Sequence, residues 1–189
     1  MQDLCREEKL EWDDELPELY RNRWERWRNE LRLLEQLQVD WCVKPSDFGE
    51  VKSREIPIFS DASATGYGSA AYLRLCNNES HIYCSFLMGK ARLAPIKVMT
   101  IPCLELTAAT VPICLGEVLK KELDDTPDVV KYHTDSTTVL RYITNDQKRF
   151  QAFVANRVQT IRRLSHPSQW MYVETKSNPA DDASCGINA

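Results

Sequence analysis

Four acidic residues stand where the sequence predicts apolar strand ends or a helix interior. They are Asp61, Glu105, Asp135 and Asp181. A carboxylate among apolar neighbours is costly unless it is paired or binds a metal ion. One such residue could close a turn and two could cap helices. Four of them at the edges of one sheet indicate convergence on a single site.

All four of these residues are hard oxygen ligands, and no Cys or His partner accompanies them in the pattern. Such a ligand set favours Mg²⁺ or Mn²⁺ over Zn²⁺. A carboxylate cluster can hold two such ions about 3.5–4 Å apart, and this arrangement stabilises the attacking and leaving oxygens of a phosphodiester. The pattern therefore predicts phosphoryl chemistry, but it does not identify the nucleic acid.

Other catalytic patterns fit the sequence less well. The Asp135–Thr137 segment lacks the Gly that the sharp turn of an aspartic protease requires, and the chain has no GxSxG elbow and no P-loop. None of the three histidines has a metal-ligand spacing. His133 alternates with Asp135 on one strand, so a supporting role stays open beside that of an ordinary core or surface histidine.

The elements that must position the carboxylates predict an α/β domain. Strands are expected over 56–61, 67–76, 81–88, 129–135 and 169–175, and helices over 102–123, 137–145 and 150–165. Three antiparallel strands followed by alternating helices and strands predict a mixed sheet. We place Pro57 near the start of the first strand and Gly66 and Gly68 in the turn after it. Pro112 should kink or split the long helix, because it removes a donor.

The first 50 residues differ from the rest of the chain. They hold 14 acidic and 8 basic residues, whereas residues 51–189 hold 14 and 16. Apolar residues from Tyr20 to Leu34 recur at spacings of three and four, which predicts an amphipathic helix with Pro17 in its first turn. Its tryptophan face could pack on its own domain or on a neighbour. We predict a connecting segment over 1–50, with a linker at 39–55, and a second domain over 51–189.

The overall composition limits the class of protein. A chain of 189 residues with 43% hydrophobic and 28% charged residues fits a globular domain with an appendage. We find no apolar run of transmembrane length and no signal peptide, so we expect no membrane partner. Seven scattered cysteines without a CxxC pair indicate a reducing compartment. The segment 141–163 has six basic residues and one acidic residue, which is typical of a solvated helical face or of a phosphate-contacting surface.

The segments FSDAS, CLELTAA, HTDSTTVL and NPADDAS occur in this order, and each contains one of the four acidic residues. Together they resemble the acidic motifs of the ribonuclease H domain of retroelement polyproteins, above all those of BEL/Pao long-terminal-repeat retrotransposons. The resemblance covers about residues 55–186, and the EWDDELP and WERW segments look like that family's connection to its reverse transcriptase. It implies a ribonuclease H-like fold, a five-stranded mixed sheet with flanking helices.

The resemblance also implies a role for each acidic residue in cleaving the RNA strand of an RNA/DNA hybrid. Asp61 would bridge two Mg²⁺ ions, with Mn²⁺ as a substitute, and Asp181 would complete the site of the ion that activates water. Glu105 and Asp135 would hold the ion at the leaving 3′ oxygen. Recognition would rest on groove shape, 2′-hydroxyls and phosphates. The expected phosphate contacts are Ser63, Ser136, Arg141, Lys148, Arg149 and Lys176.

Several positions depart from the family pattern. Lys176 stands near the place where cellular and retroviral relatives have a His, and Cys185 stands where an Arg is usual. Asp182 offers a second carboxylate beside Asp181, and we prefer Asp181 because it completes the Ala-Asp dipeptide. The chain stops at Ala189, too soon for a full final helix, so we expect a fragment of a longer polyprotein.

These observations predict a ribonuclease H-type endonuclease of a retrotransposon, which receives its hybrid from an upstream reverse transcriptase. We expect it in the cytoplasm within the retrotransposon particle, or in the nucleus. One alternative is an inactive or host-retained scaffold that binds nucleic acid or a protein partner. Another is a DNA nuclease of the same fold. The four intact carboxylates favour an enzyme, and the order of the motifs favours ribonuclease H.

Overall fold

The computed structural model describes residues 13–38, 43–97, 99–123, 127–147 and 149–185. The chain divides into two compact units. The smaller unit consists of Met1–Trp41, Ile96–Val98 and Asn188–Ala189, and the larger of Cys42–Pro95 and Met99–Ile187. The role of residues 1–50 as a connecting segment stays a prediction.

The predicted amphipathic helix forms in the smaller unit. It comprises α2 (Glu18–Glu30) and a short 3₁₀ helix, η1 (Leu31–Gln36), and Pro17 caps its N-terminus. The rings of Trp24 and Trp27 lie 4.9 Å apart on one side of α2. Both tryptophans are 48% exposed, and α2 buries none of its residues.

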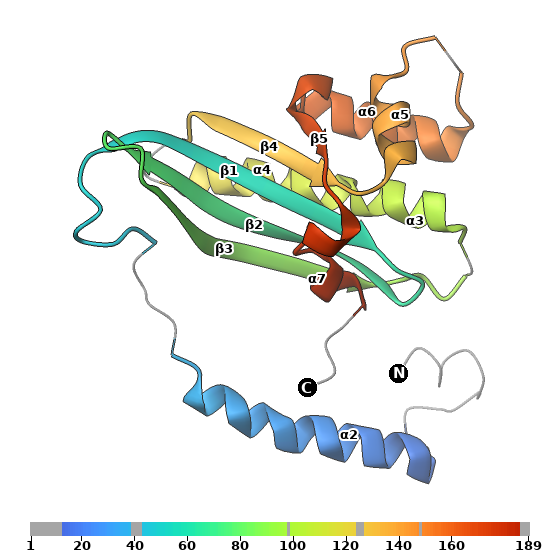
Figure 1. Cartoon of the computed structure of the whole chain (residues 1–189). Coiled ribbons are helices and arrows are strands. Elements are labelled where there is room, and N and C mark those ends of the chain that lie inside the picture. The colour runs from blue at the N-terminus through green and yellow to red at the C-terminus, as the bar shows by residue number, and fades with distance from the viewer. Residues whose placement is uncertain (1–12, 39–42, 98, 124–126, 148, 186–189) are drawn as a thin grey trace. The chain divides into compact units, whose positions relative to one another are not determined.

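The larger unit contains a five-stranded mixed sheet (Figure 1). Its strands are β1 (Val51–Ala62), β2 (Gly66–Asn77), β3 (Ile82–Leu93), β4 (Val129–Thr134) and β5 (Trp170–Tyr172). They lie in the order β3-β2-β1-β4-β5; β1–β2 and β2–β3 are antiparallel, and β1–β4 and β4–β5 are parallel. The predicted fold class is therefore confirmed.

The helices of the larger unit are α3 (Ile101–Ala108), α4 (Thr110–Glu122), α5 (Thr137–Thr144), α6 (Ala152–Leu164) and α7 (Asp181–Cys185). Helices α3 and α4 pack on β1 and β2 from behind the sheet as Figure 1 draws it. The short α7 lies in front and contacts β1, β2 and β3. As predicted, the long helix is split, at Ala109, because Pro112 has no N–H to bond with the preceding turn.

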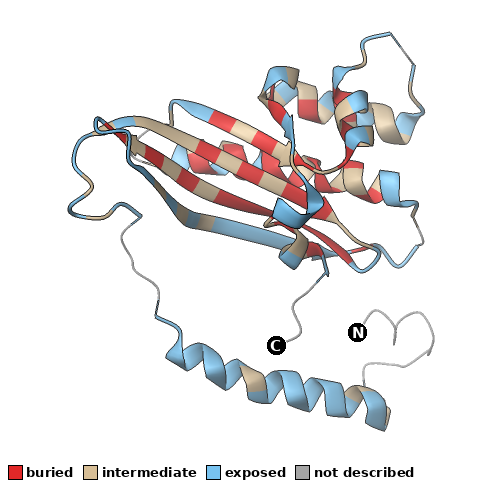
Figure 2. Ribbon diagram, viewed as in Figure 1, coloured by how far each residue is buried: buried red, intermediate tan, exposed pale blue. Residues whose placement is uncertain are grey.

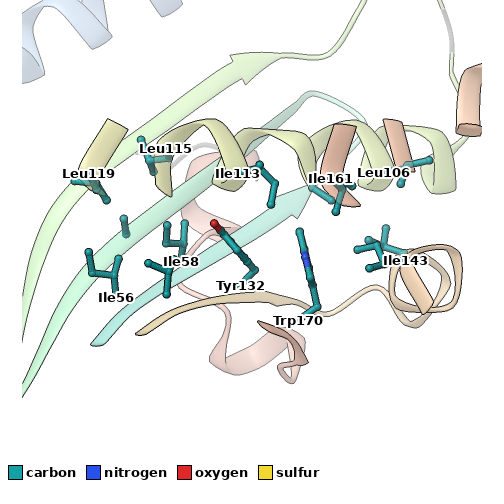
Figure 3. Close-up of a cluster of buried hydrophobic side chains, with 14 of the residues drawn as sticks. Ile56, Ile58, Leu106, Ile113, Leu115, Leu119, Tyr132, Ile143, Ile161 and Trp170 are labelled. Carbon is teal, nitrogen blue, oxygen red and sulfur yellow. The ribbon is translucent and has the colours of Figure 1, made fainter. Parts of the chain in front are cut away.

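The hydrophobic core lies between the sheet and the helices behind it. Ile56 and Ile58 of β1 are fully buried there, and Figure 3 shows them facing Leu115 and Leu119 of α4. Tyr132 of β4 and Trp170 of β5 stack with ring centroids 5.2 Å apart. The edge strand β3 is largely exposed along its length, while β1 and β2 alternate (Figure 2). The helices behind the sheet thus cover its central strands, whereas β3 stays largely open to solvent.

Four boundary predictions are wrong in detail. The third strand was predicted over 81–88, but β3 runs to Leu93 because it pairs with β2 along its whole length. Strand β1 begins at Val51, because its first residues pair with the last residues of β2. The predicted linker therefore ends before residue 51, and Pro57 lies in the middle of the strand. Strand β5 ends at Tyr172, and the chain then turns into the 3₁₀ helix η3 (Thr175–Ser177). Gly66 and Gly68 belong to β2 rather than to the turn.

The segment Ile101–Glu122 is long and apolar enough to cross a membrane by length and composition, which the sequence analysis did not recognise. Half of its most apolar window is buried inside the larger unit. Leu106, Ile113 and Leu119 take part in the core against the sheet. Core packing therefore accounts for the apolar character of α3 and α4.

Candidate active site

Two of the four predicted carboxylates reach the same edge of the sheet on neighbouring strands. The parallel register of β1 and β4 places Ser60 opposite Thr134. Asp61 and Asp135 are the next residues along each chain segment. Because the carboxyl ends of parallel strands meet at one edge, both side chains leave the sheet at the same place. The structure thus brings together the first and third acidic motifs.

Helix α7 brings the fourth motif to this edge. The ligand atoms of Asp61, Asp181 and Cys185 lie within 4.8 Å of one another. A Cβ added at Gly68 would lie 2.6 Å from the Cβ of Ala183, so α7 reaches this position only because β2 has no side chain there. The function of Gly68 is therefore close packing, not the turn that the sequence analysis expected.

Glu105 comes from α3 and is held by the turn that follows β4. The Ser136 hydroxyl donates to Oε2 of Glu105 over 2.6 Å. The same hydroxyl accepts a hydrogen bond from the Val139 amide over 3.2 Å and so caps α5. Since Ser136 directly follows Asp135, this bond links the second acidic motif to the third.

Among the residues that the structure describes, each of the four carboxylates accepts a hydrogen bond from one side chain. Besides the bond to Glu105, Thr175 donates to Oδ2 of Asp135 over 2.8 Å, and Ser184 donates to Oδ2 of Asp61. The Cys185 thiol donates to Oδ1 of Asp181 over 3.3 Å. Each bond engages one oxygen of its carboxylate. Thr175 and Ser184 were not predicted, because no spacing in the sequence distinguishes them from other hydroxyl residues.

Asp61 is the most deeply buried of the four acidic residues. Only 8% of the residue is exposed, and burial raises the pKa of its carboxyl above the ordinary value. The hydrogen bond from Ser184 lowers that pKa, whereas the charges of Asp135 and Asp181 raise it further. A divalent cation would offset the repulsion among these carboxylates, and their oxygens are the ligands that Mg²⁺ and Mn²⁺ prefer. The donor set therefore fits the predicted metal.

The structure separates Asp181 from its neighbour Asp182. Asp181 lies beside Asp61, whereas Asp182 is exposed. Burial raises the pKa of Tyr72, and the charge of Asp182 raises it further, which places Asp182 near that tyrosine. Of the two adjacent carboxylates, Asp181 is thus the one that joins the cluster.

The predicted phosphate contacts differ in their surroundings. Ser136 is buried, and its hydroxyl donates to Glu105. Arg141, Arg149 and Lys176 are exposed. Lys148 lies outside the described residues. Ser63 has an internal partner instead, since its hydroxyl donates to the Ser184 carbonyl over 2.7 Å and holds α7 on the β1–β2 turn. Contact of any of these residues with a nucleic acid stays a prediction.

Two arginines of the basic segment stabilise the fold. The Arg162 guanidinium donates to the Ile143 and Asn145 carbonyls, both over 2.9 Å, and pairs with Asp146 over 2.8 Å. Arg157 donates to Thr107 over 3.0 Å, and its guanidinium carbon lies 3.5 Å from the centre of the Phe153 ring. The phosphate-contacting interpretation therefore does not extend to these two side chains.

His133 takes part in packing and not in the carboxylate cluster. Its ring stacks on Phe59 with centroids 4.7 Å apart. Burial lowers the pKa of His133, and its Nδ1 has no hydrogen-bond partner among the residues that the structure describes. These features agree with an ordinary, partly buried histidine.

Several solved structures are similar to part of this chain. The N-terminal RNase H domain of rv2228c from Mycobacterium tuberculosis has 14% identity over 70% of this chain and 92% of that chain, with a TM-score of 0.47. RNase H1 from Halobacterium salinarum has 14% identity over 70% and 94%, with a TM-score of 0.42. LC11-RNase H1, solved in complex with an RNA/DNA hybrid, has 12% identity over 69% and 92%, with a TM-score of 0.45. No curated protein matches the chain in sequence.

The sequence itself matches one protein family, described as the Pao retrotransposon-like RNaseH-like domain, over residues 1–136. The match includes the N-terminal helix and the segments around Asp61, Glu105 and Asp135, and it ends before Asp181. The predicted resemblance to BEL/Pao elements is thereby confirmed. With its five-stranded mixed sheet, the chain has the ribonuclease H-like fold and belongs to the Pao retrotransposon-like RNaseH-like domain family.

Proposed function

We propose that this domain is a metal-dependent endonuclease that hydrolyses the RNA strand of RNA/DNA hybrids. The observation that carries the proposal is the convergence of acidic residues from separate elements at one edge of the sheet. Asp61 is the next-to-last residue of β1, Asp135 follows β4 and Asp181 begins α7. Glu105 of α3 is joined to them through Ser136. Like charges so close together repel one another and do not stabilise the fold, so stability does not explain why these carboxylates converge.

The carboxylates would hold two Mg²⁺ or Mn²⁺ ions, which supply an activated water and stabilise the leaving 3′ oxygen when bound. Hydrogen bonds from the hydroxyls of Ser136, Thr175 and Ser184 orient three of the carboxylates for binding a cation. Each of these donors holds one oxygen of its carboxylate: Ser184 that of Asp61, Ser136 that of Glu105 and Thr175 that of Asp135. A preorganised anionic site of this kind needs little rearrangement when the cation enters.

The choice of an RNA/DNA hybrid rests on the family and on the charges around the site. Residues 51–189 carry two more basic than acidic residues, although four of the acids belong to the cluster. Arg141, Arg149 and Lys176 are exposed and free to contact phosphates. We assign the domain to reverse transcription within a retrotransposon polyprotein, next to a reverse transcriptase, in a cytoplasmic particle or in the nucleus.

Cleavage of an end-labelled RNA/DNA hybrid in Mg²⁺ and in Mn²⁺ tests this proposal. RNA duplex and DNA duplex serve as substrate controls, and Asp135→Asn serves as the variant, because it keeps the shape of the side chain but not its charge. We expect cleavage of the hybrid alone, and none by the variant, which should still bind the hybrid. Cleavage of DNA duplex would indicate a DNA nuclease instead. A folded protein that binds hybrid but cuts nothing would favour a scaffold.

A further inference from the structure

Ser184 connects the two carboxylates that lie farthest apart in the sequence. It is 3% exposed and sits in the last turn of α7, three residues after Asp181. Its hydroxyl donates to Oδ2 of Asp61 and also lies 3.1 Å from the Asp181 carbonyl. A hydroxyl has one proton to donate, and a bond to an ionised carboxylate is stronger than one to a neutral carbonyl. Asp61 is therefore its principal acceptor.

The backbone of Ser184 is fixed from the opposite side. Its carbonyl accepts hydrogen bonds from Ser63 over 2.7 Å and from Thr65 over 3.5 Å, both in the β1–β2 turn. A Cβ at Gly66 would lie 3.0 Å from the same carbonyl oxygen, so the contact with β2 is close. Ser184 is thus held at both ends, and its hydroxyl has little freedom to leave Asp61.

We propose that Ser184 is a positioning residue that orients the Asp61 carboxylate toward its metal ion. This inference rests on the proposed function of the carboxylate cluster. The bond fixes Oδ2 of Asp61 and so limits the rotation of a carboxylate whose ligand atom lies within 4.8 Å of that of Asp181. Ser184 does not touch the reacting atoms; it acts through Asp61. Residues that hold a metal ligand by a hydrogen bond commonly contribute about 10-fold to 100-fold in metal affinity.

Binding of Mn²⁺, followed by the loss of its free-ion electron paramagnetic resonance signal, tests the proposal without any need for catalysis. We expect Ser184→Ala to bind Mn²⁺ about 10-fold to 100-fold more weakly than the wild type. Ser184→Thr keeps the hydroxyl and should bind as the wild type does. The matched control is Ser165→Ala, which removes a buried serine hydroxyl that bonds Ile161 and Trp170 away from the cluster. Thermal unfolding establishes that each variant is folded.

Three results would overturn the role of Ser184. The first is unchanged Mn²⁺ affinity in Ser184→Ala. The second is an equal loss in Ser165→Ala, which would reduce the effect to general destabilisation. The third is a wild type that binds no Mn²⁺, which would contradict the metal site as well. A wild type that binds Mn²⁺ but cleaves no hybrid contradicts the proposed function alone, and the affinities of the variants still decide the role of Ser184.

Discussion

The two halves of the carboxylate cluster are built by different means. Glu105 and Asp135 stand on α3 and at the end of β4, elements that belong to the hydrophobic core, and Ser136 joins them. Asp61 and Asp181 depend on α7, a helix of five residues packed on the front of β2. Half of the cluster thus stands on elements of the core, and the other half also requires α7 to stay packed on Gly68 and bonded to the β1–β2 turn. We expect the second half to be the more easily disturbed.

The largest effect should come from Asp61→Asn, which removes the most buried carboxylate of the cluster. Cleavage should fall below detection, because a neutral amide is a poor ligand for Mg²⁺. Metal-free protein should nevertheless be more stable at neutral pH, since burial raises the pKa of Asp61 and makes its ionised form unfavourable in the folded state. Thermal unfolding in EDTA measures this gain.

The sign of this gain follows from the direction of the pKa shift. A folded pKa above the ordinary value of 3.8 means that ionised Asp61 lowers the stability of the wild type at neutral pH. That penalty disappears as the pH falls through the raised pKa toward 3.8, so the advantage of Asp61→Asn should shrink over the same interval. A variant less stable than the wild type at neutral pH would contradict this environment for Asp61.

Gly68→Ala should disturb the Asp61–Asp181 half alone. Its new methyl group would meet Ala183 at 2.6 Å and force α7 away from β2. Overpacking of this kind costs about 1–3 kcal/mol in the free energy of unfolding, and cleavage should fall with it. Gly89→Ala on β3 is the control, because its methyl group would meet the end of the Phe86 ring at 3.2 Å and the Ser69 carbonyl oxygen at an ordinary 3.8 Å. Equal activities of the two variants, measured on the hybrid, would argue against the packing role of Gly68.

Ser136→Ala tests the half of the cluster that the core supports. It removes both the cap of α5 and the bond to Glu105. Loss of a cap costs about 1 kcal/mol, and we expect the rate of cleavage to fall further than this destabilisation explains. Ser136→Thr keeps both bonds and should restore stability and rate. A Thr variant as slow as the Ala variant would show that the hydroxyl is not what matters.

The smallest effect should come from Thr175→Val, which keeps the side-chain shape and removes the donor to Asp135. Both partners of this bond are accessible to water, so its net contribution to stability is about 0.5–1.5 kcal/mol at most. We expect a modest reduction in cleavage and little change in thermal unfolding. A loss as large as that of Asp135→Asn would mean that Thr175 has a direct role in the reaction.

The sequence predicted the core-supported half of the cluster more completely than the other half. Periodicity placed Asp135 at the end of β4 and Glu105 in an apolar helix, since both follow from the alternation of buried and exposed residues. The packing of α7 on Gly68 leaves no periodic trace, because it depends on a missing side chain and a contact between distant segments. Gly68 was therefore interpreted as part of a turn.

Contacts between segments that are distant in the sequence also explain why other residues were interpreted wrongly. The basic segment 141–163 suggested phosphate contacts, yet Arg157 and Arg162 bond to their own fold. Charge counts cannot tell a guanidinium with internal acceptors from one that faces solvent. Ser184 and Thr175 are single hydroxyl residues without a pattern, and only the folded chain shows which carboxylate each of them meets.

Hybrid cleavage by five single variants tests the central claim most directly. Four of them neutralise the cluster: Asp61→Asn, Glu105→Gln, Asp135→Asn and Asp181→Asn. The fifth, Asp182→Asn, neutralises the exposed carboxylate beside Asp181 and makes the same change in net charge. We predict loss of Mg²⁺-dependent cleavage in the four variants and near wild-type cleavage in Asp182→Asn. Full activity in any of the four, or its loss in Asp182→Asn with Asp181→Asn active, would contradict this site.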